Sequence, residues 1–207
     1  MTEYKNFIED FPSRCRNILH LAGRPALSRG CEVTLILMVA SAGLVVPYER
    51  LKPDRGCGAH PSGDTKTFAD AAEKLKSLLD EPFISSVLWS GPSSTWFHGK
   101  LVSLNGHPES WEGLQKRKPL SREKKVGTVV KIIRNALAHA NICTFKDPIE
   151  AIIFINSNLN GDHQARDYSF IYVVPKDFQK FLENWFDFLK DFHIPQEAAF
   201  EVLKDAA

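Results

Sequence analysis

The sequence predicts a mainly α-helical bundle with one β-hairpin inserted before the C-terminal helix. Apolar residues recur at spacings of three and four over much of the chain, which is typical of amphipathic helices. Two β-rich runs, 151–156 and 168–174, flank a turn-like segment and form a hairpin pattern. After Pro175, large apolar residues follow helical spacing as far as Phe192, which indicates a core helix rather than a cofactor site.

Four further helices are expected before the hairpin. Their predicted ranges are 3–22, 31–46, 67–80 and 121–140. In the first of these helices, Pro12 suits a first turn and makes the part after it firmer. The apolar run from Val33 to Val46 is too short to span a bilayer and suits a core helix.

The other segments read as loops within a single domain of residues 1–207. Loop-rich insertions are expected at about 47–66 and 82–119, where Pro, Gly, Ser and His are frequent. Trp96 and Trp111 fall in the second insertion and are expected to dock on the surface. The length allows a substantial core without disulfides or metals.

Composition favours an ordinary cytoplasmic protein. Apolar residues make up 43% of the chain and charged residues 25%, and nothing at the N-terminus resembles an export signal. The four cysteines are widely spaced and form no CxxC pair. Cys15 and Cys31 lie in helical or apolar contexts, so we expect buried free thiols in a reducing compartment.

The net charge of +1 hides an uneven distribution. Between Gln115 and Arg134 there are eight basic residues and one acidic residue, Glu123. Such a run is ordinarily a solvated helix face. Here it leads into the 121–140 helix, along which a polyanion is expected to lie.

The end of that helix carries Arg134, Asn135 and His139. An Arg-Asn pair, three further residues and a histidine resemble the signature of HEPN domains (higher eukaryotes and prokaryotes nucleotide-binding), many of which are ribonuclease toxins. Residues 32–47 and 151–192 resemble a plasmid-borne subgroup of that superfamily. The resemblance implies a HEPN-like helical bundle, a ribonuclease that dimerises around this helix, and a role in toxin–antitoxin or anti-phage defence.

The looser family pattern, an arginine followed by four to six residues and a histidine, has little value here. It occurs three times, and the other two matches are Arg14 to His20 and Arg55 to His60. Only the third match has the Arg-Asn pair and lies on a long apolar helix followed by a hairpin.

The faces of the helix suggest a dimer. Its expected core stripe consists of Val126, Val129, Val130, Ile133, Leu137 and Ala140. Thr128, Asn135 and His139 lie roughly opposite, and Arg134 is about 140° from His139 around the helix axis. Ile132 borders this polar side. An exposed isoleucine there predicts contact with a second copy, with two His139 side chains close together.

The expected chemistry is metal-free cleavage of RNA, without a cofactor. The 2′-hydroxyl attacks the adjacent phosphate and leaves a 2′,3′-cyclic phosphate and a 5′-hydroxyl. His139 is assigned to acid–base work, Arg134 to phosphate charge, and Asn135 to orienting the phosphate or His139. The side chains expected to guide the RNA backbone are Lys124, Thr128 and Lys131.

Alternative interpretations remain open. One alternative takes His139 as a simple helix C-cap and the chain as a non-catalytic dimeric HEPN module that binds RNA or a protein. A metal centre is a further alternative, although its possible ligands match no zinc spacing: Cys57, His60, His98 and His107. The resemblance also implies an antitoxin or another defence protein as a partner. No association with a membrane is expected. A nucleotidyltransferase antitoxin that modifies a tyrosine near the motif is disfavoured, because no tyrosine lies between Tyr48 and Tyr168.

Overall fold

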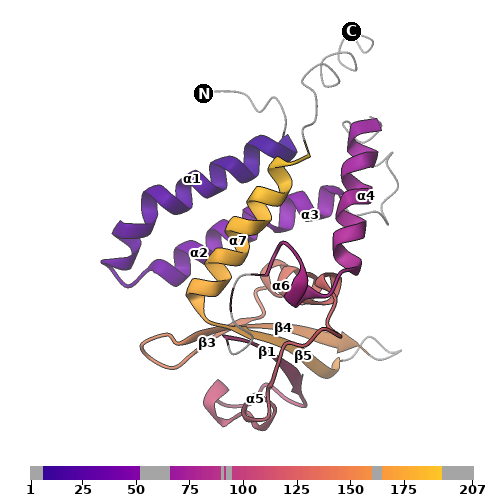
Figure 1. The fold of residues 1–207 in the computed structure, drawn as a ribbon. Helices are drawn as coiled ribbons and strands as arrows, with labels where there is room; N and C mark the ends of the chain where they lie inside the picture. The colour runs from indigo at the N-terminus through magenta and orange to yellow at the C-terminus, as the bar shows by residue number, and fades with distance from the viewer. Residues whose placement is uncertain (1–6, 52–65, 90, 92–94, 160–164, 193–207) are drawn as a thin grey trace. The chain divides into compact units, whose positions relative to one another are not determined.

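The computed structural model describes residues 7–51, 66–89, 91, 95–159 and 165–192, which form two compact units. The first takes the described residues up to Leu79 and from Glu183 onward, and the second takes Asp80–Leu182. A single domain of 207 residues stays a prediction. In chain order the main elements (Figure 1) are α1 (Phe7–Leu27), α2 (Glu32–Gly43), α3 (Val45–Leu51), α4 (Lys66–Asp80), β1 (Trp96–Leu101), α5 (Glu112–Gln115), β2 (Lys118–Pro119), α6 (Val126–Ala138), β3 (Ile142–Phe145), β4 (Ala151–Leu159), β5 (Ala165–Val173) and α7 (Pro175–Lys190).

The second unit is built on a five-stranded antiparallel sheet with strand order β2-β1-β5-β4-β3. The fold is therefore mixed α/β, and the prediction of a mainly α, or all-α, bundle with one hairpin is wrong. The predicted hairpin is confirmed as β4 and β5 at the centre of the sheet, and α7 follows it as expected. The additional strands β1 and β2 come from the segment 82–119 that was expected to be a loop, and β3 comes directly after α6.

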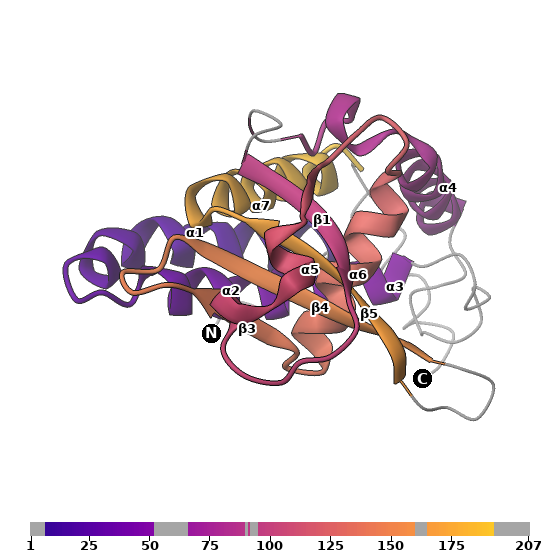
Figure 2. The ribbon, with the colours of Figure 1, turned by 90° about the horizontal axis from the view of Figure 1, so that it is seen from below.

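One face of the sheet packs against α5 (Figure 2). Because side chains alternate along a strand, every second residue of β4 and β5 points to this side. The buried cluster consists of Leu101, Trp111, Leu114, Ala151, Ile153, Ile155, Phe170 and Tyr172. Trp111 is thus part of the core, and the expectation that it docks on the surface is wrong.

The opposite face packs against α6 and the first half of α7 through a second, aromatic core. The Phe154 and Phe178 rings lie 4.7 Å apart, and the Phe83 ring lies 5.1 Å from that of Trp96. Phe181 contacts both Phe83 and Trp96. Trp96 has no exposed surface, so its expected surface position is also wrong.

Helix α6 is shorter than the predicted 121–140 helix at both ends. The helix begins at Val126, with Lys125 as its N-cap, because the Val126 N–H donates to the Glu81 carbonyl at 2.9 Å and fixes the start of the helix there. At the other end Ala140, the last residue of the predicted helix, takes the left-handed conformation, with φ 55°. The Asn141 N–H then donates to the Ala136 carbonyl, a Schellman-type closure. Ala140 is exposed and so lies outside the core stripe.

The first unit contains α1 to α3, most of α4 and the end of α7. Trp185 of α7 donates its indole N–H to the Gly43 carbonyl of α2 at 3.0 Å. Burial raises the pKa of the Cys15 thiol to about 11, in agreement with its prediction as a buried free cysteine. Cys31, however, is exposed, because it precedes α2 rather than lying within a buried helix.

The expected 31–46 helix is two helices, α2 and α3, which follow each other almost without a break. Together Glu32–Leu51 are 20 residues long and apolar enough to cross a membrane by length and composition alone. This corrects the prediction, made from the shorter run Val33 to Val46, that the segment is too short to span a bilayer. Their buried residues recur at helical spacing, as in a core helix: Val33, Ile36, Val39, Ala40, Gly43, Leu44, Pro47, Tyr48 and Leu51.

The packing of α2 against α7 predicts a penalty for any side chain at Gly43. A Cβ there would lie 2.7 Å from the ring of the fully buried Phe186 and 3.2 Å from the Cys15 Cβ. We expect Gly43→Ala to lower the free energy of unfolding by about 1–3 kcal/mol, measured by urea titration. Gly23→Ala in α1 is the matched control, because no atom lies within 4 Å of its added Cβ, and it should gain up to about 1 kcal/mol. Equal effects of the two substitutions would contradict the packing argument.

Candidate functional site

The arginine of the motif is held by its neighbour on α6. The Arg134 Nη1 donates to the Asn135 Oδ1 at 2.5 Å, and the Asn135 Nδ2 donates to the Asn156 Oδ1 on β4 at 2.6 Å. All three residues are half-buried. Both atoms of the Asn135 amide are therefore engaged in joining Arg134 to the sheet.

The chain of hydrogen bonds continues across the sheet surface. The Asn156 Nδ2 donates to the Asn158 Oδ1 at 3.4 Å. The Asn158 Nδ2 in turn donates to Asp167 and to the Ser169 Oγ, the latter at 2.9 Å. Lys100 of β1 forms an ion pair with the same Asp167 at 3.3 Å.

The charged groups at the two ends, Arg134 and Asp167, determine which atom donates and which accepts in each of these hydrogen bonds. Arginine can only donate hydrogen bonds, so the Asn135 oxygen must face Arg134 and its nitrogen must face Asn156. An ionised carboxylate can only accept, so the Asn158 nitrogen must face Asp167. We call these five side chains the polar relay: Arg134, Asn135, Asn156, Asn158 and Asp167.

His139 is the C-cap residue of α6, and its side chain is exposed. Its backbone N–H donates to the Asn135 carbonyl at 3.0 Å, so it lies one helical turn beyond Asn135 on the same face. The Arg134 Cα is about 140° away from His139 around the axis, but the guanidinium turns toward Asn135. A single copy of the chain thus brings the guanidinium to the helix face that carries His139.

Ile132 departs from its expected position. It is only 8% exposed, because it packs over the sheet near Ile171 instead of facing solvent. The prediction that Ile132 is exposed is therefore wrong, and Ile132 gives no support for a subunit contact. A homodimer through this helix remains a prediction that rests on the family resemblance.

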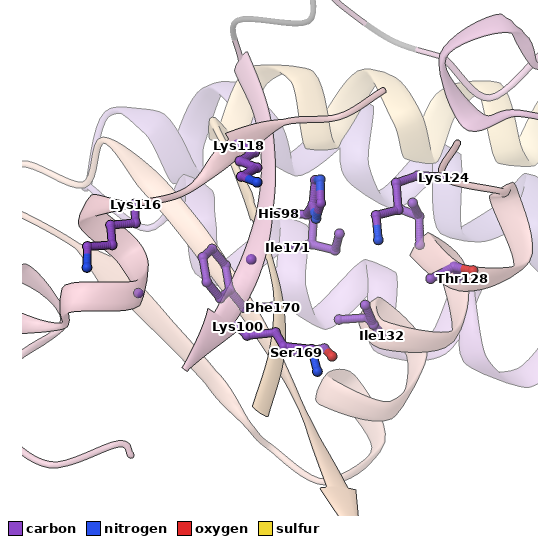
Figure 3. A pocket seen from close by; sticks show the side chains of 13 residues that line it. His98, Lys100, Lys116, Lys118, Lys124, Thr128, Ile132, Ser169, Phe170 and Ile171 are labelled. Atoms are coloured by element: carbon purple, nitrogen blue, oxygen red, sulfur yellow. The ribbon is translucent and has the colours of Figure 1, made fainter. Parts of the chain in front are cut away.

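Two of the three predicted RNA-guiding residues lie together. Lys124 and Thr128 line a pocket of about 430 Å³ between β1 and the start of α6 (Figure 3). Lys131 is exposed on α6 and is not part of this lining. The pocket also contains His98 and Lys118, which the sequence did not assign to RNA, because β1 and β2 were expected to be loops.

Asn156 was also missed. Its signal in the sequence is its place at the end of the apolar run Ala151–Ile155, where the strand becomes polar. The partner Asn135 is 21 residues away, so the contact needs the three-dimensional arrangement of α6 and β4.

The proposed metal ligands are not brought together within the described part of the chain. Cys57 and His60 lie outside the described residues. His98 lies on β1, and His107 is exposed in the loop before α5. Among the residues whose positions are described, no group of three or more His, Cys, Asp and Glu side chains is placed to hold a metal ion.

Comparison with known proteins assigns the family. A family model described as HEPN pEK499 p136 matches residues 1–196, which is nearly the whole chain and includes the α6 motif. A search of curated proteins and a search of solved structures each gave no match. HEPN domains are commonly ribonucleases. The chain belongs to the HEPN pEK499 p136 family.

Proposed function

We propose that this protein is a metal-independent endoribonuclease of the HEPN type. The observation that carries the proposal is the arrangement on α6: the Arg134 guanidinium is held 2.5 Å from the Asn135 Oδ1, on the face where His139 is exposed one turn further on. A fixed cation beside an accessible imidazole suits a reaction in which negative charge grows on a phosphate.

In the proposed reaction the ribose 2′-oxygen forms a bond to the adjacent phosphorus, and the bond from phosphorus to the 5′-oxygen breaks. The products are a 2′,3′-cyclic phosphate and a 5′-hydroxyl. His139 transfers one of the two protons, either from the 2′-hydroxyl or to the 5′-oxygen, and the same residue of a second copy transfers the other. Arg134 stabilises the charge of the phosphorane-like transition state.

Asn135 acts through Arg134 in this scheme. Both ends of its amide are used within the chain, so it holds the guanidinium in place. The family resemblance supports a homodimer around α6 and a role in toxin–antitoxin or anti-phage defence. An antitoxin or another defence protein is the partner expected on that basis.

Replacement of the exposed imidazole tests the acid–base assignment. We expect His139→Ala to lower the rate of cleavage of labelled RNA by about 10²–10⁴-fold, because one proton transfer loses its catalyst. His107→Ala is the matched control, since His107 is an exposed histidine of the same compact unit, and it should stay within about twofold of the wild type.

The same assay separates the alternatives. Cleavage should persist in EDTA and stop when the RNA is replaced by DNA or by 2′-O-methyl RNA. Full activity of His139→Ala, or loss of activity in EDTA, would overturn the mechanism. RNA binding without any cleavage by the wild-type protein would instead identify a non-catalytic HEPN module.

Asn156 is proposed as a residue that positions Arg134 through Asn135. Two variants of Asn156 should distinguish this role from an effect on the stability of the fold. Asn156→Leu removes the acceptor for the Asn135 amide, and we expect kcat to fall about tenfold with KM little changed, as for the loss of a hydrogen bond to a half-buried amide. Asn156→Asp keeps an acceptor oxygen at that place and should retain most of kcat. Equal losses in both variants would contradict a role through Asn135.

A further inference from the structure

The pocket between β1 and the start of α6 has an unusual lining. Its lining contains no carboxylate but includes four lysines: Lys100, Lys116, Lys118 and Lys124. In Figure 3, His98 stands between Lys118 and Lys124, and Thr128 and Ile132 lie across from it on α6. The pocket combines a cationic rim with an apolar floor.

The rim keeps much of its charge. Lys100 pairs with Asp167, and Lys116 pairs with Glu112. Within the described part of the chain, Lys118 and Lys124 have no ion-pair partner. Two like charges on either side of an imidazole repel one another, and an anion between them would relieve that repulsion.

The backbone holds these lysines in place. Lys118 of β2 pairs directly with His98 of β1. The Lys124 carbonyl accepts the Phe83 N–H at 2.8 Å, and its N–H donates to Ser121. The N-terminus of α6 begins at the next residue but one and adds the partial positive charge of the helix dipole.

The pocket is continuous with the polar relay. Its wall includes Ser169, which accepts a hydrogen bond from Asn158, and Lys100, which pairs with Asp167. Thr128, Ile132, Asn135 and His139 lie on one face of α6. At 1.5 Å per residue, Thr128 is about 16 Å along the axis from His139, a distance of a few nucleotides.

We propose that this pocket binds a backbone phosphate of the RNA substrate a few nucleotides from the scissile linkage. Lys118 and Lys124 contact the phosphate, and Ile132 contacts the adjoining nucleoside. The inference rests on the proposed function for the choice of RNA as the phosphate-bearing ligand. It assigns the pocket to strand positioning rather than to chemistry.

The test is equilibrium binding of a fluorescent 16-nucleotide 2′-O-methyl RNA, which cannot undergo 2′-hydroxyl attack, to the full chain. The double variant Lys118→Gln/Lys124→Gln should bind at least about tenfold more weakly, because charged hydrogen bonds are lost. The slope of log K against log salt should also shrink by about 0.7, the contribution of one single-strand phosphate. The matched control is Lys176→Gln/Lys180→Gln, two exposed lysines of the same compact unit, which should bind as the wild type does.

Thr128→Phe distinguishes binding of RNA in the pocket from its general electrostatic attraction to the lysines. This exposed helix position tolerates a larger side chain, and the change fills the pocket without altering the charge. We expect weaker RNA binding with the salt slope reduced as well. Unchanged affinity in Thr128→Phe, or equal losses in the two double variants, would overturn the proposal.

A second arm of the test identifies the source of the phosphate. AMP and inorganic phosphate are added as competitors, and both should displace the RNA only at millimolar concentration. Micromolar displacement by AMP would make the pocket a mononucleotide site and overturn the RNA assignment. If the wild type binds RNA through the lysines but does not cleave it, the proposed function fails and the pocket stands. If it cleaves RNA and the double variant binds normally, only the pocket fails.

Binding should also depend on pH through His98. Burial, then Lys124, then Lys118 lower the pKa of this imidazole below its usual value. Lys100 also lies on its strand, while Thr128, Ser169 and Ile171 opposite carry no charge. A bound phosphate raises that pKa again, so binding takes up a proton and tightens as the pH falls from 7.5 to 6. His98→Gln should flatten this dependence, and an unchanged profile would contradict phosphate binding next to His98.

Discussion

The hydrogen bond between Asn135 and Asn156 is the constraint on which the rest of the site depends. It joins α6 to the sheet at the point where β4 changes from apolar to polar. On one side of this bond the Arg134 guanidinium is held by the same amide. On the other side the relay runs to Asp167, which pairs with Lys100. Arg134 can only donate hydrogen bonds and Asp167 can only accept them, so together they fix the orientation of every amide between them.

The sheet face under α6 has two halves, and this division explains the mixed character of the helix. Over the apolar half, α6 buries valines and isoleucines, Ile132 among them. Over the polar half, the Asn135 side chain meets an amide of the sheet instead of solvent. A helical wheel assumes one apolar face and one solvent-exposed face. For this reason the sequence predicted Ile132 at a subunit contact.

The elements with strong local patterns could be predicted, namely β4, β5, α7 and the motif helix. The strand β1 could not, because it carries Gly99 and is stabilised by pairing with β5, about 70 residues later in the chain. Gly99 reads as a loop residue, yet a Cβ there would lie 2.7 Å from the Phe170 ring. Gly113 is similar, since its Cβ would lie 2.1 Å from the Lys100 carbonyl oxygen. Both glycines are required by close packing, which single-sequence patterns do not distinguish from turn formation.

Within the site, too, local residues could be predicted and residues joined by strand pairing could not. Arg134, Asn135 and His139 are close in sequence, whereas Asn156 and the lysine pocket depend on strand pairing. That pairing has a strict consequence. A shift of one residue in the register of β4 would turn Asn156 and Asn158 to the α5 side and present Ile155 to Asn135. The apolar alternation that buries Ile153 and Ile155 therefore also places the amides under α6, so the register that forms the core and the register that holds the arginine are one and the same.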